Sequence, residues 1–265
     1  MSTVIYRREG HVGMIGLNRP EKLNAINEEM KTDLLRVLDE FTADDEARVA
    51  ILYGEGRGFC TGIDLSPQGD YEHPYVLHDR DRIEDSVRTW LRLWECPKPI
   101  IAQVHGFCFA GGTQPPLFCD LVAVGEETRI GFPKVPVGGG FISPMWSWRV
   151  GSQWARYMSY QVGIEITGRQ AHEMGYAALI YPEAELADRV MEVAQNMAKV
   201  PAEMLRIKKA ANNRVQELQG FRVAVLQAAE WDAIAHTAET VDVARSWIAE
   251  HGLKGAIAKF HQEGM

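Results

Sequence analysis

The chain has 265 residues, of which 46% are hydrophobic and 24% are charged, so it can bury a sizeable core and is not globally disordered. A net charge of -8 without a basic, aromatic-interleaved stripe argues against nucleic-acid binding, and no apolar run approaches the roughly 20 residues that span a bilayer. The first residues lack a signal peptide's apolar region, and the 4 cysteines lack C-x-x-C spacing, so we expect a cytoplasmic protein with reduced thiols, no disulfide framework and no metal site.

Strands and helices alternate over about the first two-thirds of the chain. Apolar runs predict strands at 3–7, 12–17, 48–53, 99–104, 120–125 and 129–132. Apolar residues at helical spacing predict a helix capped near Asn27 and further helices at 80–95, 145–161 and 168–175.

Helices alone follow an extended piece at 177–181. Their predicted ranges are 183–199, 201–218, 220–236 and 239–250. This order favours an α/β core over residues 1–200 with a C-terminal helical region over residues 201–265.

The stretch 105–120 follows a predicted strand with small residues and then a helix start. Gly111 and Gly112 come first, Thr113 suits a helix N-cap, and Pro115 and Pro116 suit a first helical turn. This arrangement gathers unpaired N–H groups and the positive end of a helix, where an anion or a developing oxyanion can lie. A tight turn that needs small residues for steric reasons explains the same pattern.

A second loop, 54–65, also follows a strong strand with several glycines. If the two strands are neighbours, both loops open at the same edge of the sheet. One N–H from each loop can then hold a single oxygen, and each such donor contributes roughly 3–4 kcal/mol to a charged transition state.

The segments NRPEKLNA (18–25), GRGFCTGIDL (56–65), HGFCFAGG (105–112) and CDLVAV (119–124) resemble the crotonase, or enoyl-CoA hydratase/isomerase, superfamily. The resemblance implies a spiral of ββα units whose C-terminal helices build homotrimers, often paired into hexamers. It implies an acyl-CoA substrate, with coenzyme A as part of the substrate and no further cofactor. It also places the oxyanion hole at the N–H groups of Ile63 and Gly111, and the coenzyme A site at Arg19, Lys22, Leu23, Ala25, Thr61, Gly62, Ile63, Asp64, Leu65 and Gly112.

The chain departs from this family at the two glutamates that handle water and proton in the hydratases. The resemblance places them at Gln114 and Lys134. A glutamine hydrogen-bonds but exchanges no proton at neutral pH, and a lysine acts as a base only if burial lowers its pKa. An ordinary exposed lysine is the simpler interpretation of Lys134.

Other candidates for proton transfer have structural explanations. Asp64 and Asp120 are expected to order their loops, and His105 is expected to be structural. Asp70, Tyr71, His73, His78 and Asp79 are expected in a solvated loop, and the helical face of Glu230, Asp232 and His236 is expected to make surface pairs. Packing and an acyl-pocket wall explain equally well the aromatic residues Phe141, Trp146, Trp148 and Trp154.

The sequence leaves three hypotheses open. The first is an acyl-CoA lyase, isomerase or hydrolase that stabilises a thioester oxyanion. The second is an acyl-CoA binder without catalysis, and the third is a C–C bond hydrolase or decarboxylase that acts on a β-dicarbonyl substrate.

Overall fold

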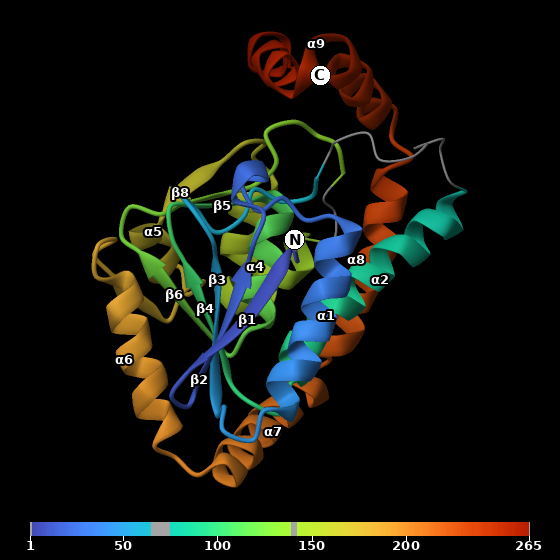
Figure 1. Ribbon diagram of the computed structural model, residues 1–265. Coiled ribbons are helices and arrows are strands. Elements are labelled where there is room, and N and C mark those ends of the chain that lie inside the picture. Colours follow the sequence, from blue (N-terminus) through green and yellow to red (C-terminus); the bar gives the residue numbers. More distant parts are fainter. Residues whose placement is uncertain (1, 65–74, 139–141, 265) are drawn as a thin grey trace.

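The computed structural model describes residues 2–64, 75–138 and 142–264, and it contains a large and a small sheet with helices around them (Figure 1). The large sheet has the order β1-β2-β3-β4-β6-β9. Its strands are β1 (Val4–Glu9), β2 (Val12–Leu17), β3 (Val49–Gly54), β4 (Ile100–Val104), β6 (Leu121–Gly125) and β9 (Leu179–Tyr181). Only the first pair of this sheet, β1 with β2, is antiparallel.

The small sheet joins three short strands that are distant in sequence. Its strands are β5 (Phe107–Phe109), β7 (Arg129–Gly131) and β8 (Glu165–Thr167), in the order β5-β7-β8. The sequence predicted a loop where β5 lies. A strand of this length has no periodicity of its own, so only its pairing with β7 defines it.

The helices and short 3-10 turns connect these strands. They are η1 (Pro20–Lys22), α1 (Glu28–Ala43), α2 (Val76–Glu95), η2 (Ala110–Thr113), α3 (Gln114–Phe118), α4 (Ile142–Ser159), α5 (Gly168–Glu173), α6 (Leu186–Ala198), α7 (Ala202–Leu218), α8 (Phe221–Ala235) and α9 (Glu239–Glu263). The predicted cap of α1 is confirmed, because the Asn27 side chain accepts a hydrogen bond from the Met30 N–H at 2.9 Å.

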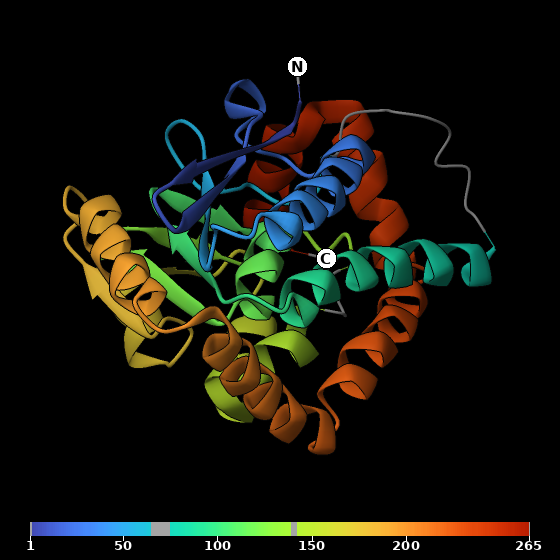
Figure 2. The same ribbon diagram turned by 60° about the horizontal axis from the view of Figure 1, so that its bottom comes forward.

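Strand β3 shows why the large sheet carries helices on both faces. It is buried along its whole length, as expected of a central parallel strand. Because successive side chains point to opposite faces, Val49 and Ile51 pack in the core beneath α6, whereas Ala50 and Leu52 join the larger core that includes α1 and α2. Figure 2 shows α6 on one face of the sheet and α1 and α2 on the other.

The C-terminal helices do not all lie in one place. Helix α8 lies beside α2, and its residues Phe221 and Val225 belong to the larger core of the molecule. Helix α9 stands away from the sheets (Figure 1) and continues past the predicted end at residue 250, because the helix resumes after a kink at Gly252. Helix α2 also begins before the predicted residue 80.

Candidate functional site

The loops after β3 and β4 lie side by side at the same edge of the sheet. The two strands are parallel neighbours, which is the condition under which both loops open at one edge. Cys60 pairs with Cys108 in a parallel bridge, in which the Phe109 N–H donates to the Cys60 carbonyl at 2.9 Å. The same number of residues further along each loop come Ile63 and Gly111, and a Cβ built on Gly111 would lie 3.3 Å from the Ile63 nitrogen. The two predicted donors are therefore adjacent.

The backbone pairing of the neighbouring residues leaves the Ile63 amide uncommitted. Ile26 donates to the Gly62 carbonyl and accepts from the Asp64 N–H, both at 2.8 Å, so the Ile63 N–H points away from this bridge. Gly111 lies in the first turn of η2, where an N–H has no partner within the helix. Within the described ranges, no backbone carbonyl accepts a hydrogen bond from either N–H.

Unusual backbone conformations shape this junction. Gly62 has φ +104, and the Cβ of any other residue at this position would lie 3.1 Å from the Gly111 nitrogen. Ala110 has φ +49 although it is not a glycine, which costs roughly 1–2 kcal/mol. Strain of this kind concentrates where a site requires a defined backbone geometry.

The residues predicted to bind coenzyme A form a connected layer beside the two amides. Arg19 forms an ion pair with Asp64 at 2.9 Å and donates to the Ala25 carbonyl. The Leu23 carbonyl accepts from the Thr61 N–H at 3.2 Å. The structure therefore brings the 18–25 loop against the 60–64 loop. Asp64 holds the two loops together through Arg19, in line with the expectation that it orders its loop.

The remaining residues predicted to bind coenzyme A differ in exposure, and one of them is not described by the structure. Lys22 is exposed on η1, and Gly112 is buried against the Cys60 carbonyl. Leu65 lies outside the described residues, as do Asp70, Tyr71, His73 and Phe141.

Gln114 is fully buried at the start of α3, one turn after Gly111. Its Oε1 accepts from the Trp90 indole N–H at 2.8 Å, and because indole only donates, this contact fixes which end of the amide is the oxygen. The Gln114 Nε2 is then a buried donor, and it has no acceptor among the described residues. A buried donor left in this way costs roughly 1–3 kcal/mol, so the site favours a ligand that supplies an acceptor.

The expectation that Thr113 caps a helix was wrong. Thr113 precedes α3, but its hydroxyl does not cap that helix and instead donates to the Ala110 carbonyl at 2.8 Å. The reason is that η2 continues directly into α3, so the Thr113 backbone is already helical and its hydroxyl bonds back into the preceding turn.

Lys134 is half-buried and committed to other groups. Its ammonium forms an ion pair with Glu165 and lies 5.7 Å from the centre of the Phe109 ring. Burial alone would raise the pKa of Glu165, but Lys134 and Arg129 together hold this pKa below its ordinary value. The Lys134 ammonium is therefore already paired with an ionised carboxylate.

The structure places together three ionisable side chains that the sequence assigned to the surface. His236 Nδ1 lies 2.5 Å from Asp79 Oδ2, and His236 Nε2 lies 3.9 Å from Asp232 Oδ1. Asp79 is only 6% exposed and Asp232 only 2%. The expectations of a solvated Asp79 and of surface pairing for Asp232 and His236 were wrong, because α8 packs against α2 and covers both carboxylates. The i, i+4 spacing of Asp232 and His236 was the available signal.

Two further predicted residues have structural roles. His105 Nε2 bonds to the Gly56 carbonyl at 3.0 Å, and Trp146 is fully buried and stacks on Tyr176 with ring centres 4.6 Å apart. Trp154, in contrast, is exposed.

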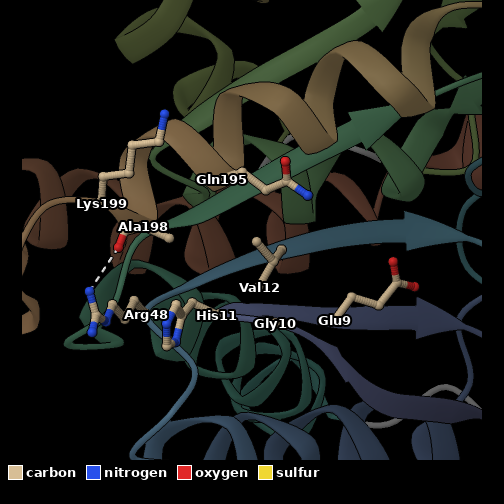
Figure 3. Close-up of a pocket in the computed structure, with 8 residues that line it drawn as sticks. All are labelled: Glu9, Gly10, His11, Val12, Arg48, Gln195, Ala198 and Lys199. Atoms are coloured by element: carbon tan, nitrogen blue, oxygen red, sulfur yellow. Dashed lines mark hydrogen bonds between the residues drawn. The ribbon is translucent and has the colours of Figure 1, made fainter.

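A separate pocket of about 710 Å³ lies at the opposite edge of the sheet. Figure 3 shows it between the end of β1, the starts of β2 and β3, and α6, with Glu9, His11, Arg48 and Lys199 among its residues. In sheets of this type ligands bind at the carboxyl ends of the parallel strands, where the Ile63 and Gly111 loops lie, so this pocket is not the candidate site.

Within the described ranges, no group of three or more His, Cys, Asp or Glu residues could hold a metal ion. No helix in those ranges has the length and hydropathy needed to cross a membrane.

Comparison with known proteins agrees with this geometry. Residues 7–250 match the family model described as enoyl-CoA hydratase/isomerase. The chain is 31% identical over 224 residues to the hydroxycinnamoyl-CoA hydratase-lyase of Pseudomonas fluorescens, covering 82% of this chain and 80% of that one. It is 31% identical over 228 residues to the 1,2-epoxyphenylacetyl-CoA isomerase of Escherichia coli K12, covering 82% of this chain and 84% of that one.

Solved structures show the same relationship. The crystal structure of an enoyl-CoA hydratase from Mycobacterium smegmatis superposes with a TM-score of 0.89 at 29% identity, covering 97% of this chain and 92% of that one. The chain therefore belongs to the enoyl-CoA hydratase/isomerase family of the crotonase superfamily, whose members transform acyl-CoA thioesters.

Proposed function

We propose that this protein binds an acyl-CoA thioester and holds its carbonyl oxygen between the N–H groups of Ile63 and Gly111. The observation that carries the proposal is the adjacency of these two amides, neither of which bonds to a backbone carbonyl in the described ranges. Two such donors stabilise the negative charge of an enolate or a tetrahedral intermediate, by roughly 3–4 kcal/mol each.

The coenzyme A portion of the substrate would lie along the 18–25 and 60–64 loops. Arg19 is committed to Asp64 and holds the two loops together, so its role there is structural. Lys22 is the exposed cation of the 18–25 loop and is suited to a phosphate of coenzyme A. Coenzyme A enters as part of the substrate, and we propose no additional cofactor.

The reaction would not use the pair of carboxylates that hydrates an enoyl-CoA. Gln114 can donate a hydrogen bond but exchanges no proton, and Lys134 is paired with Glu165. The named relatives are a hydratase-lyase and an isomerase, so the family accommodates several outcomes from one activated thioester. We therefore propose a lyase, isomerase or hydrolase reaction through a stabilised oxyanion.

The Gln114 amide favours one alternative in particular. Its Nε2 is a buried donor without an acceptor among the described residues, close in sequence to Gly111. A β-dicarbonyl substrate brings a second carbonyl oxygen close to the thioester and can accept from this N–H. This supports C–C bond hydrolysis or decarboxylation as the second candidate function.

A chromophoric acyl-CoA tests the oxyanion hole without requiring turnover. Binding of a cinnamoyl-CoA should shift its absorbance to longer wavelength, because two donors polarise the thioester carbonyl. The thioether analogue, which lacks that carbonyl, should bind without the shift. Binding of cinnamoyl-CoA with an unchanged spectrum would contradict the proposal.

Incubation with enoyl-CoA, acyl-CoA and 3-oxoacyl-CoA substrates then separates the candidate functions. Hydration, isomerisation, or release of an acid or carbon dioxide each identifies a reaction class. A spectral shift without turnover of any substrate would identify a binding protein without catalysis.

The assembly and location rest on the family resemblance and the sequence. We propose a homotrimer or homohexamer built through the C-terminal helical region, residues 201–265, in the cytoplasm. Light scattering of the purified protein measures the assembly, and a monomer at micromolar concentration would contradict it.

A further inference from the structure

The side chain of Thr113 links helix α4 to the turn that carries the Gly111 amide. Its hydroxyl accepts a hydrogen bond from the Trp146 indole N–H at 3.2 Å and donates one to the Ala110 carbonyl at 2.8 Å. Thr113 and Trp146 are both 0% exposed, so water does not compete for either hydrogen bond. The two bonds form a buried chain that ends on η2.

The chemistry of its two ends fixes the direction of this chain. An indole N–H can only donate, and a backbone carbonyl can only accept. The Thr113 hydroxyl has one proton, which therefore lies between its oxygen and the Ala110 oxygen, while a lone pair of the hydroxyl faces Trp146. The indole thus determines how the hydroxyl is oriented.

The Ala110 carbonyl and the Gly111 N–H are the two ends of one peptide group. This peptide is trans, so its C=O and its N–H point in opposite directions. Thr113 holds the carbonyl end, which leaves the N–H directed away from Thr113. The Gly111 nitrogen lies at the junction with the 60–64 loop, where a Cβ built on Gly62 would be 3.1 Å from it. A hydrogen bond to the carbonyl also polarises the peptide and strengthens its N–H as a donor.

The other donor peptide is held in the same way, but by the backbone. The Gly62 carbonyl, which shares a peptide with the Ile63 N–H, accepts from the Ile26 N–H at 2.8 Å. No side-chain substitution removes that donor. The Gly111 peptide depends instead on a side-chain hydroxyl, so the two halves of the oxyanion hole can be perturbed separately.

The surroundings of Thr113 fix a backbone conformation that a residue other than glycine rarely adopts. Ala110 has φ +49, and a conformation of this kind persists only where neighbouring contacts impose it. The Tyr176 hydroxyl donates to the Thr113 carbonyl at 3.2 Å. Tyr176 also stacks on Trp146 with ring centres 4.6 Å apart, and the Phe132 ring meets the same indole at 5.2 Å and 75°. The indole therefore has a fixed position from which to hold the hydroxyl.

We infer that Thr113 and Trp146 are positioning residues of the oxyanion hole. The indole orients the Thr113 hydroxyl, and the hydroxyl orients and polarises the Ala110–Gly111 peptide, so that the Gly111 N–H points at the substrate oxygen. Neither side chain touches the substrate. This inference rests on the proposed function, because it needs a thioester carbonyl between Ile63 and Gly111.

The absorbance of bound cinnamoyl-CoA tests the inference, because it reports how strongly the thioester carbonyl is polarised. Thr113→Val removes the hydroxyl and keeps the shape of the side chain. We expect it to lose about half of the red shift at saturation, because one of the two donors is no longer held at the carbonyl. The Kd of the thioether analogue, which lacks the carbonyl, should stay within about twofold of wild type.

Two variants grade the effect along the chain. Thr113→Ser keeps the hydroxyl and should keep the red shift. Trp146→Phe keeps the hydroxyl but removes the N–H that orients it, and it should lose about a tenth to a third of the red shift.

The protein offers a matched control for each partner. Thr128 is also 0% exposed, and its hydroxyl donates to the Val104 carbonyl at 3.2 Å. Trp94 is buried, and its indole N–H donates to Gln216 at 2.7 Å. Neither hydrogen bond ends on a donor peptide of the oxyanion hole, so Thr128→Val and Trp94→Phe should keep the full red shift.

Each outcome decides between the possibilities. A full red shift in folded Thr113→Val would overturn the inference and leave the proposed function intact. An equal loss in Thr128→Val or in Thr113→Ser would also overturn it, because general disturbance of the core would then explain the loss. If Thr113→Val does not fold, Trp146→Phe decides, and a full red shift in that variant would overturn the inference. A wild-type protein that binds cinnamoyl-CoA without any red shift, or does not bind it, would contradict the proposed function itself.

Discussion

Replacing Gln114 with glutamate introduces the residue type that the family resemblance implies, at a position that the structure shows to be fully buried. Gln114 is 0% exposed, and its Oε1 accepts one hydrogen bond, from the neutral Trp90 indole. No cation contacts it among the described residues, so a carboxylate there would be ionised without a counter-charge. We expect Gln114→Glu to fold with a protonated Glu at low pH and to lose stability as the pH rises.

The magnitude follows from the burial. An ordinary Glu has a pKa of about 4.3, and full burial raises such a pKa by about 3–5 units. Allowing for the Trp90 hydrogen bond, a net rise of about 3 units corresponds to a loss of about 4 kcal/mol in the free energy of unfolding. Because the folded form holds its proton more tightly, the loss begins near pH 4 and is complete above about pH 7.

Urea denaturation of both proteins across this pH range measures the loss. Gln170→Glu is the matched control, because Gln170 is an exposed residue of the α5 capping box, where a carboxylate is tolerated or mildly stabilising. If Gln114→Glu loses no more stability than Gln170→Glu at pH 8, or if its loss does not grow between about pH 4 and about pH 7, the Gln114 side chain does not lie in a buried site without a counter-charge.

Three further changes test other parts of the fold by the same denaturation assay. Lys209→Met should lower the free energy of unfolding by about 3 kcal/mol, because the buried ammonium that contacts Asp120 at 2.7 Å is lost. Adding Asp120→Asn should recover part of this loss. Full stability of the single Lys209→Met variant would contradict the expectation. The hydrogen bonds that Asp33 accepts from Thr3 outweigh its burial and lower the Asp33 pKa to about 2, so its contribution should be present above about pH 4 and be lost as the pH falls through about 2. Asp33→Asn should flatten this acid dependence, and an unchanged acid limb would count against the contact. Ala110→Gly should raise the free energy of unfolding by about 0.5 kcal/mol, because relief of the positive φ exceeds the added chain entropy; a loss above about 1 kcal/mol would show that Ala110 is not strained.

Local patterns predicted most of the secondary structure, and the family resemblance assigned the two donors to Ile63 and Gly111. The apolar runs marked the strands of the large sheet, and the glycines around Gly62 and Gly111 marked two loops, which the pairing of β3 with β4 brings to one sheet edge. These signals suffice because a strand run and a turn residue act over only a few neighbouring positions. Their role in catalysis stays a prediction that the spectral experiment tests.

The sequence could not predict how the Gln114 side-chain amide is oriented. Its amide can donate or accept, and the choice depends on Trp90, which reaches it from a different helix. The family pattern identified the position and the loss of a carboxylate, but only the packing of α2 against α3 assigned the oxygen to the indole and the donor to the site.

The sequence by itself determined the family, the α/β class, the two loops that carry Ile63 and Gly111, and the absence of a glutamate at both expected positions. Tertiary structure alone decided that Lys134 pairs with Glu165 and that Asp79 meets His236 across 157 positions of chain. The physical reason is that periodicity and turn preferences act between near neighbours. The partner of a buried charge, in contrast, is set by which helix faces come together when the core is packed.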